Sequence, residues 1–468
     1  YNECNAYFLS SHFIKLSVAC FLLLGMALIS VSEGAEADFS VEPRWTYEEL
    51  QANTQSIHIS GDGSTVVVTN GSSSDNDWNG FDVFTGGGQF LWRYEYDDDE
   101  DDTYIQDIDI SDDGEHIVAI SHDYVIVFDR NSSTPEWIWS SSDNCGGSIQ
   151  DIDISANGEN FAVGTYTTND CNNSYTLFFF DTDSDDYDWR DQAGSLRGVT
   201  ISDDGSSLAA RTFANNLRYY DTDDSSVDWT DSIYFETAAF SYNGDYLVIS
   251  GYDSDDNVVL YNTSNGDEEW SFENEEDCDV QVVDISHNGD YIVAQEYKRQ
   301  SCESADLHYF NKNSSTPVWS TSDIDLTTNS YNWEADILSS DGKHIAVGTN
   351  EKFYYFDSDS STPKWDVTID GGDCNSNTIV HVSLSKDGER IATACDDVIS
   401  VYEDFSASLE WSYETEGEYV RSVDISQDGE YVVMGSNNDY VYLFNKDSNI
   451  PVWSYDTESN MCSVAISA

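Results

Sequence analysis

Residues 420–436 read VRSVDISQDGEYVVMGS, and this stretch decides the fold. VRSVDIS and EYVVMGS have the apolar pattern of short β-strands, and the residues between them have the composition of a hairpin turn. Asp428-Gly429 suits a tight turn because glycine adopts positive φ angles without steric cost. Two more apolar segments follow, VYLFN at 441–445 and VWSYDT at 452–457, so the unit contains four predicted strands.

The same unit occurs nine times along the chain of 468 residues. Each copy places a serine, an Asp or Asn, and a glycine between two apolar runs. The turn glycines are Gly63, Gly114, Gly158, Gly205, Gly244, Gly289, Gly342, Gly388 and Gly429. Their mean spacing is about 46 residues. A period of this length with four strands per copy is typical of propeller blades. The sequence therefore predicts an all-β propeller of four-stranded antiparallel blades.

Two features of the repeat resemble known propeller families. Residues 426–433 look like the first hairpin of WD-repeat proteins, and this resemblance runs from about residue 45 to the end. A tryptophan follows the last turn of each unit, as in the tryptophan-docking repeats of quinoprotein-like propellers: Trp92, Trp137, Trp189, Trp229, Trp270, Trp319, Trp365, Trp411 and Trp453. Pairs such as Phe128-Asp129 replace the Trp-Asp of WD repeats, and Gly-His is absent. The resemblance implies the fold and no particular function.

Partial repeats flank the nine full ones. Residues 44–47 match a fourth strand alone, which would close a ring by completing the last blade. Residues 463–468 match a first strand that stops before its turn, so we expect a C-terminally truncated chain. Nine full repeats exceed the usual four to eight blades. Residues 38–468 are therefore expected to form either one large ring or two consecutive propellers.

The N-terminus predicts export. Residues 16–31 are apolar, too short for a typical membrane span, and Ala35-Glu36-Ala37 offers a cleavage site. We assign residues 1–37 to a signal peptide and upstream residues, which predicts a secreted or cell-surface protein. An uncleaved N-terminal anchor is the alternative.

Six of the nine cysteines fall at equivalent places in three blades, one before the first strand and one between the second and third. These two loops emerge on the same face of an antiparallel blade. We predict three disulfides within blades, which imply an oxidising compartment: Cys145–Cys171, Cys278–Cys302 and Cys374–Cys395.

The formal net charge of −72 excludes a nucleic-acid binder and disfavours docking onto an anionic membrane. Acidic residues gather in the turns. Asp181, Asp183 and Asp185 have the alternating spacing with which a calcium loop opens, although the glycine and glutamate of a complete loop are missing. They are the candidate Ca²⁺ ligands, and we expect no cofactor other than Ca²⁺. The alternative is a solvated, salt-adapted surface.

A column of long polar residues five positions before the repeat serine is expected to ring one mouth of the central channel, where propellers commonly bind ligands. Its members are Gln55, Gln106, Gln150, Arg197, Glu236, Gln281, Glu334 and Arg421. Hydrogen bonding between blades is the alternative role. The even repetition favours a binding scaffold for a protein or glycan partner at the cell surface, without catalysis. A propeller enzyme, quinone-dependent or glycan-active, that uses the channel mouth is the alternative.

Overall fold

The computed structural model describes residues 46–47, 54–70, 79–96, 105–167, 174–214, 216–233, 235–251, 257–274, 278–297, 305–321, 324, 337–349, 352–368, 381–395, 397–403, 407–415, 419–438, 440–456 and 464–466. All of them belong to one compact unit, Glu42–Ala468. Within these ranges the single helical element is a short 3₁₀ turn, Ser142–Asn144. No helix of this described part is long and apolar enough to span a membrane.

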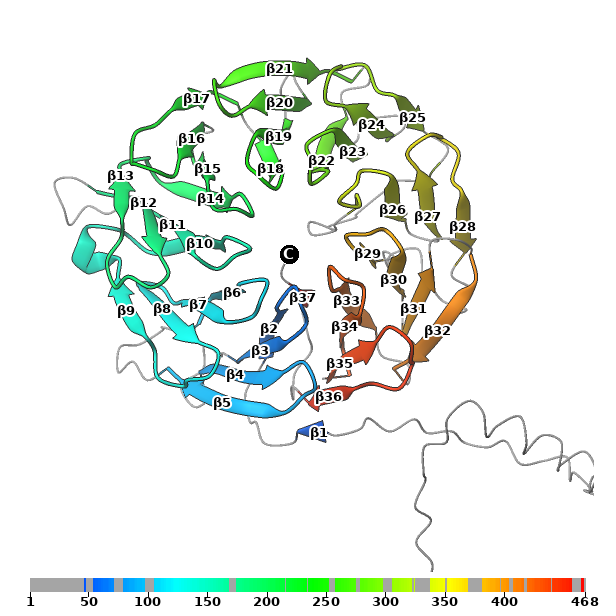
Figure 1. The fold of residues 1–468 in the computed structure, drawn as a ribbon, viewed down its shortest axis with the longest axis horizontal. Helices are drawn as coiled ribbons and strands as arrows, with labels where there is room; N and C mark the ends of the chain where they lie inside the picture. The colour runs from blue at the N-terminus through cyan, green and yellow to red at the C-terminus, as the bar shows by residue number, and fades with distance from the viewer. Residues whose placement is uncertain are drawn as a thin grey trace, which may run out of the picture. The chain divides into compact units, whose positions relative to one another are not determined.

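The strands form nine antiparallel blades that follow one another around a central axis (Figure 1). Blades 1 to 3 comprise β2 (Thr54–Ile59), β3 (Thr65–Asn70), β4 (Gly80–Thr85), β5 (Phe90–Glu95); β6 (Asp107–Ile110), β7 (His116–Ile120), β8 (Tyr124–Asp129), β9 (Trp137–Ser140); β10 (Ile149–Ile154), β11 (Asn160–Thr165), β12 (Leu177–Asp181) and β13 (Trp189–Asp191). Blades 4 to 6 comprise β14 (Leu196–Ile201), β15 (Ser207–Thr212), β16 (Leu217–Asp221), β17 (Trp229–Asp231); β18 (Phe235–Phe240), β19 (Tyr246–Gly251), β20 (Val258–Asn262), β21 (Asp267–Phe272); β22 (Asp279–Ile285), β23 (Tyr291–Tyr297), β24 (Leu307–Asn311) and β25 (Trp319–Thr321). Blades 7 to 9 comprise β26 (His344–Gly348), β27 (Lys352–Asp357), β28 (Trp365–Thr368); β29 (His381–Leu384), β30 (Arg390–Cys395), β31 (Val398–Glu403), β32 (Leu409–Glu414); β33 (Val420–Ile425), β34 (Tyr431–Ser436), β35 (Tyr440–Asn445) and β36 (Trp453–Asp456). In each blade we call the strands A to D from the axis outward; in blade 7, a bridge from Leu338 to Ile345 takes the place of strand A.

The repeats form one ring, so the prediction of four-stranded propeller blades is confirmed and the choice between one ring and two is settled. Both partial repeats pack at the junction of blades 9 and 1. Strand β1 (Thr46–Tyr47) pairs in parallel with β36, as a fifth strand outside the last blade. It therefore adds to a blade that already has its own strand D. Strand β37 (Ala465–Ile466) pairs in parallel with β2, on the axial side of blade 1.

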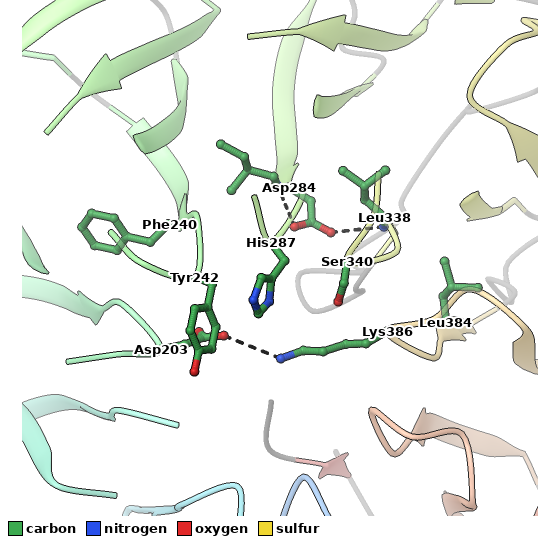
Figure 2. Close-up of a pocket in the computed structure, with 10 residues that line it drawn as sticks. Asp203, Phe240, Tyr242, Asp284, His287, Leu338, Ser340, Leu384 and Lys386 are labelled. Atoms are coloured by element: carbon green, nitrogen blue, oxygen red, sulfur yellow. Dashed lines mark hydrogen bonds and ion pairs between the residues drawn. The ribbon is translucent and has the colours of Figure 1, made fainter. Parts of the chain in front are cut away.

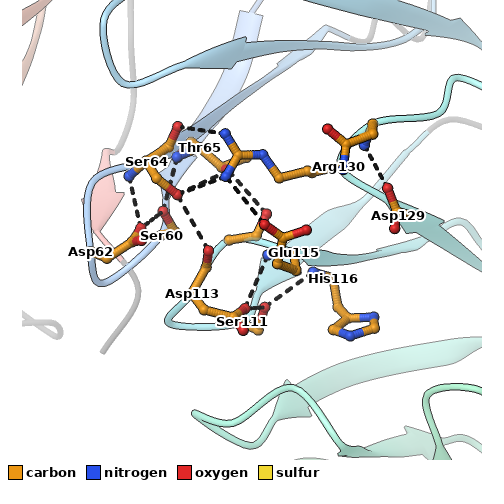
Figure 3. A network of polar contacts seen from close by, with 12 residues as sticks. Ser60, Asp62, Ser64, Thr65, Ser111, Asp113, Glu115, His116, Asp129 and Arg130 are labelled. Carbon is orange, nitrogen blue, oxygen red and sulfur yellow. Dashed lines mark hydrogen bonds and ion pairs between the residues drawn. The ribbon is translucent and has the colours of Figure 1, made fainter.

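The turn between strands A and B is held by its own serine and acid. In blade 1 the Ser60 hydroxyl donates to Asp62 Oδ1 at 2.8 Å and accepts the Thr65 N–H at 3.0 Å. The same Asp62 oxygen accepts the Ser64 N–H at 2.8 Å. Blade 2 repeats this arrangement beside it (Figure 3). Thr65 Oγ1 of blade 1 also donates to the Gly114 carbonyl of blade 2 at 2.9 Å. The Ser-x-Asp/Asn-Gly motif thus builds the turn and also joins neighbouring blades.

The turn glycines are required for two reasons. All nine have positive φ, between 65° and 75°, as the sequence predicted. In addition, the first side chain of strand B in one blade packs directly on the turn glycine of the next blade. Tyr431 of blade 9 covers Gly63 of blade 1, and Tyr291 covers Gly342. His344 covers Gly388 in the same way.

The nine tryptophans connect the outer strands of neighbouring blades. The indole N–H of Trp92 donates to the carbonyl of Arg130 in blade 2 at 2.6 Å, and its ring stacks on Phe128 at 5.4 Å. Indole-to-carbonyl bonds of 2.6 to 3.1 Å to the next blade recur at Trp137, Trp189, Trp229, Trp270, Trp319 and Trp411. The buried apolar residues form clusters that span adjacent blades, such as the one joining blades 9 and 1. The core therefore lies between the blades.

We expect Gly63→Ala to destabilise the ring by about 2–4 kcal/mol, because it adds left-handed strain to overpacking. An added Cβ would lie 2.4 Å from the Tyr431 ring. Gly194→Ala is the matched control, since Gly194 also has positive φ, +88°, but no atom lies within 4 Å of its Cβ position. It should cost only about 1–2 kcal/mol. Urea unfolding measures the free energy of unfolding of both variants. Equal losses would show that the close approach of Tyr431 to Gly63 adds no cost beyond the backbone strain.

Candidate functional site

One end of the axis is surrounded by the A–B turns. We call the nine residues between the repeat serine and the Asp or Asn the turn ring: Gly61, Asp112, Ala156, Asp203, Tyr242, His287, Ser340, Lys386 and Gln427. Backbone N–H groups at or next to these positions donate to carbonyls of the following blade, for example from Tyr242 to His287 at 3.1 Å and from Ser340 to Lys386 at 2.7 Å. This chain of bonds fixes the turns at the axis.

Side chains of the turn ring meet across the axis. Lys386 Nζ of blade 8 lies 3.6 Å from Asp203 Oδ2 of blade 4, and Gln427 Nε2 of blade 9 donates to Asp112 Oδ2 of blade 2 at 3.2 Å. Between blades 4 and 8 a cavity of about 130 Å³ is lined by five members of the turn ring, namely Asp203, Tyr242, His287, Ser340 and Lys386 (Figure 2). Its apolar wall consists of Phe240, Ile285, Leu338 and Leu384.

The rim of this cavity is an aromatic platform beside a charge pair. The rings of Tyr242 and His287 stack with centroids 4.0 Å apart, and Tyr242 is 39% exposed. Partial burial, and then the charge of Lys386, lower the pKa of His287, while Asp203 opposes the shift. The platform is therefore uncharged at neutral pH and can hold an apolar or aromatic group, with Lys386 and Asp203 available for hydrogen bonding.

Aspartates of the innermost strands join neighbouring blades below the turn ring. Asp109 Oδ2 accepts the Ile154 N–H of the next blade at 3.0 Å, and Asp153 Oδ2 accepts the Ile201 N–H at 2.8 Å. Asp151 bonds the Val199 N–H in the same way, at 2.8 Å. These carboxylates satisfy amide groups on the axial edge of strand A, which has no further strand to pair with in these blades.

Burial raises the pKa of these three aspartates. Desolvation raises the pKa of Asp109 and Asp151 to about 7 and that of Asp153 well above its ordinary value, and neighbouring carboxylates add to each shift. Desolvation likewise raises the pKa of Asp112 in the turn ring to about 7, although Lys386 acts against it. A raised pKa means that the folded state binds the proton more tightly than the unfolded chain does. The associated stability is fully present below pH about 4 and is lost as the pH rises through about 7.

We expect Asp153→Asn to be more stable than the wild type by about 1–2 kcal/mol at pH 8 and nearly equal to it at pH 4. The amide oxygen can still accept the Ile201 N–H, while the costly buried charge is removed. Asp183→Asn is the control, because it removes one charge from an exposed turn. Urea unfolding at both pH values measures the difference. A gain at pH 8 that is the same for both variants would assign the effect to net charge alone.

Six of the eight residues of the predicted mouth column lie in strand A, where each marks a backbone irregularity, and Gln106 directly precedes β6. The pairing of strands A and B shifts register by a β-bulge at Gln55, Gln150, Arg197, Glu236, Gln281 and Arg421. A bulge redirects a side chain out of the regular alternation.

The described side chains of this column do not converge. Gln106 is exposed, and the Gln150 amide donates to Ser148 Oγ at 2.9 Å within its own loop. The Arg197 guanidinium lies over the Phe213 ring at 4.7 Å. Glu334 and the side chains of the other four members lie outside the described residues. A binding role for this column stays a prediction.

The candidate Ca²⁺ ligands lie in an exposed C–D turn of blade 3. Asp181 Oδ1 accepts the Asp183 N–H at 2.9 Å, a turn contact that Asn262 makes equally with Ser264 in blade 5. Across the described residues, no three His, Cys, Asp or Glu side chains are grouped so as to hold a metal ion, and Asp185 is among the residues covered. Calcium binding stays a prediction.

Cys145, Cys278 and Cys395 are disulfide-bonded. Cys171, Cys302 and Cys374, the partners predicted from the sequence, lie outside the described residues. The pairing therefore stays a prediction.

Comparison with known proteins agrees with the architecture. The family model "WD domain, G-beta repeat" matches residues 408–445, which run from strand D of blade 8 through strand C of blade 9. The chain is a nine-bladed β-propeller in which residues 408–445 match the WD-repeat model. This propeller is similar to a solved structure of "the eukaryotic initiation factor", with TM-score 0.56 and 11% identity over 80% of this chain and 93% of that one. At this identity the likeness shows the fold alone.

Two further structures are similar to this propeller at lower TM-scores. The C-terminal WD40 domain of Sif2 has TM-score 0.48 and 10% identity, over 84% of this chain and 96% of that one. BamB from Moraxella catarrhalis has TM-score 0.45 and 14% identity, over 72% of this chain and 93% of that one. No curated protein sequence matches the chain significantly.

Proposed function

We propose that this WD-repeat propeller is a binding scaffold that holds a protein partner at its turn ring. Propellers of the WD type commonly act as protein-interaction scaffolds. The observation that carries the proposal is the cavity rimmed by the stacked, partly exposed Tyr242 and His287. Exposed aromatic groups beside a pocket with a few polar groups are the usual anchors of protein interfaces.

Charge favours a basic partner. A net charge of −72 creates a strongly negative field, which accelerates the approach of cationic molecules and repels anionic ones. At the turn ring, the partly exposed carboxylate of Asp203 can accept a hydrogen bond from a cationic group, and an apolar or aromatic side chain fits against the platform. We therefore expect a segment that combines Lys or Arg with one aromatic residue.

We further propose that the scaffold works outside the cell. The apolar run at residues 16–31 and the three disulfide-bonded cysteines support this location, because disulfides persist in oxidising compartments. A glycan partner and an enzymatic channel mouth stay predictions, since neither has an observation of its own in the described part of the chain.

The proposal is tested by panning a random 12-residue peptide library displayed on phage against the full chain. We expect enriched peptides with Lys or Arg and an aromatic residue, and affinity that falls as salt is added. Tyr242→Ala should weaken the binding of the best peptide about tenfold or more. Tyr166→Ala is the control, because Tyr166 forms another exposed aromatic pair, with Phe213. Peptides that bind both variants and the wild type equally would place the partner elsewhere.

A further inference from the structure

Blade 6 carries three polar side chains in a row across three adjacent strands. Glu296 lies on β23, His308 on β24 and Ser320 on β25. His308 Nε2 is 2.9 Å from Glu296 Oε1, and His308 Nδ1 is 2.7 Å from Ser320 Oγ. The pairing of β24 with β25 places His308 directly opposite Ser320. These are the distances of an acid, a base and a nucleophile that act in sequence.

Burial and hydrogen bonding fix the orientation of the imidazole. Glu296 is 4% and His308 is 5% exposed. The second carboxylate oxygen of Glu296 accepts the Asp306 N–H at 2.9 Å, so the carboxylate is held from both sides. An ionised carboxylate only accepts hydrogen bonds, so it selects the tautomer with a proton on Nε2. Nδ1 is then left to accept the proton of the Ser320 hydroxyl.

The nucleophile is accessible while its base is shielded. Ser320 is exposed, and β25 is the outermost strand of its sheet. The Phe272 ring of blade 5 lies 4.9 Å from the His308 ring, and Phe310 lies 6.0 Å away on the same strand. A substrate can therefore approach Ser320 from solvent, while aromatic side chains surround the imidazole.

The propeller fold does not require this arrangement. In blade 8 the corresponding pair on strands C and D is Ser400 and Ser412, which keeps the outer serine and lacks the histidine. In blade 9 the corresponding pair is Tyr442 and Ser454. Blade architecture is thus compatible with many residues at this place, and the order of acid, base and serine is particular to blade 6.

We propose that Ser320 is an activated nucleophile that accepts an acyl group from small esters and so gives the protein a hydrolytic activity on blade 6. Ser320 Oγ attacks the ester carbonyl carbon while its proton passes to His308 Nδ1. The bond from carbon to the alcohol oxygen then breaks, and the alcohol leaves with that proton. Water repeats the sequence on the acyl-serine and releases the carboxylic acid, which restores Ser320. Glu296 is a positioning residue, because it orients the imidazole and stabilises its charged form.

The experiment treats the full chain with a fluorophosphonate, which forms a phosphorus–oxygen bond to an activated serine and releases fluoride. Peptide mapping should find the label on Ser320. Ser320→Ala should abolish labelling, while Ser412→Ala, the matched serine of blade 8, should leave it unchanged. His308→Gln and Glu296→Gln should each slow labelling at least tenfold. Hydrolysis of p-nitrophenyl acetate should follow the same order.

Rescue by a conservative variant separates positioning from mere support of the fold. Glu296→Asp keeps a carboxylate beside the imidazole and should recover part of the labelling rate that Glu296→Gln loses. Circular dichroism checks that the variants are folded. Wild-type protein that takes up no label at Ser320, or labelling that is unchanged in folded His308→Gln, would overturn the proposal. Neither result would affect the proposed binding at the turn ring, which lies on other residues.

Discussion

The docking of each tryptophan on the next blade is the interaction on which the ring depends. A four-stranded blade is too small to bury its own apolar faces, so its stability comes from its neighbours. The indole meets this need with a broad stacked contact and one directed hydrogen bond, as between Trp92, Phe128 and the Arg130 carbonyl. The bond fixes the distance and angle between blades, because the acceptor carbonyl belongs to a turn whose position is set by its own sheet.

A ring of repeats must also join its last blade to its first, and here the junction is reinforced at every depth. At the axis β37 pairs with β2, and on the outside β1 pairs with β36. Between them the Tyr431 ring covers Gly63, and Trp453 stacks on Phe84 at 6.5 Å. The junction therefore contains the glycine and aromatic contacts of the other interfaces together with two strands contributed by the chain ends. Separation of blades 9 and 1 would require all of these to break together.

The parts of the structure that the sequence predicts are those that every repeat needs. Gly429 and its eight equivalents stand out in the sequence because a positive φ and a close neighbour leave no alternative residue. The nine tryptophans stand out because each one docks on the next blade. The cavity could not be predicted, because Asp203 of blade 4 and Lys386 of blade 8 are far apart in the sequence and meet only across the axis of the ring. Glu296, His308 and Ser320 were missed because their spacing reflects hairpin length and matches no known sequence motif.

These misses have a common cause that also indicates where function resides. The serine, glycine and tryptophan of each repeat are committed to turns and docking, so a change there weakens an interface. The turn-ring position carries no such constraint, because it holds residues as different as Gly61 and Lys386. The facing pair on strands C and D is equally free to vary, as the pairs His308–Ser320 and Ser400–Ser412 show. A repeat protein can vary these positions blade by blade without loss of the ring. Departures from repetition that also bring polar groups into contact, as in blades 4 to 8, are therefore the places where specific binding and chemistry can arise.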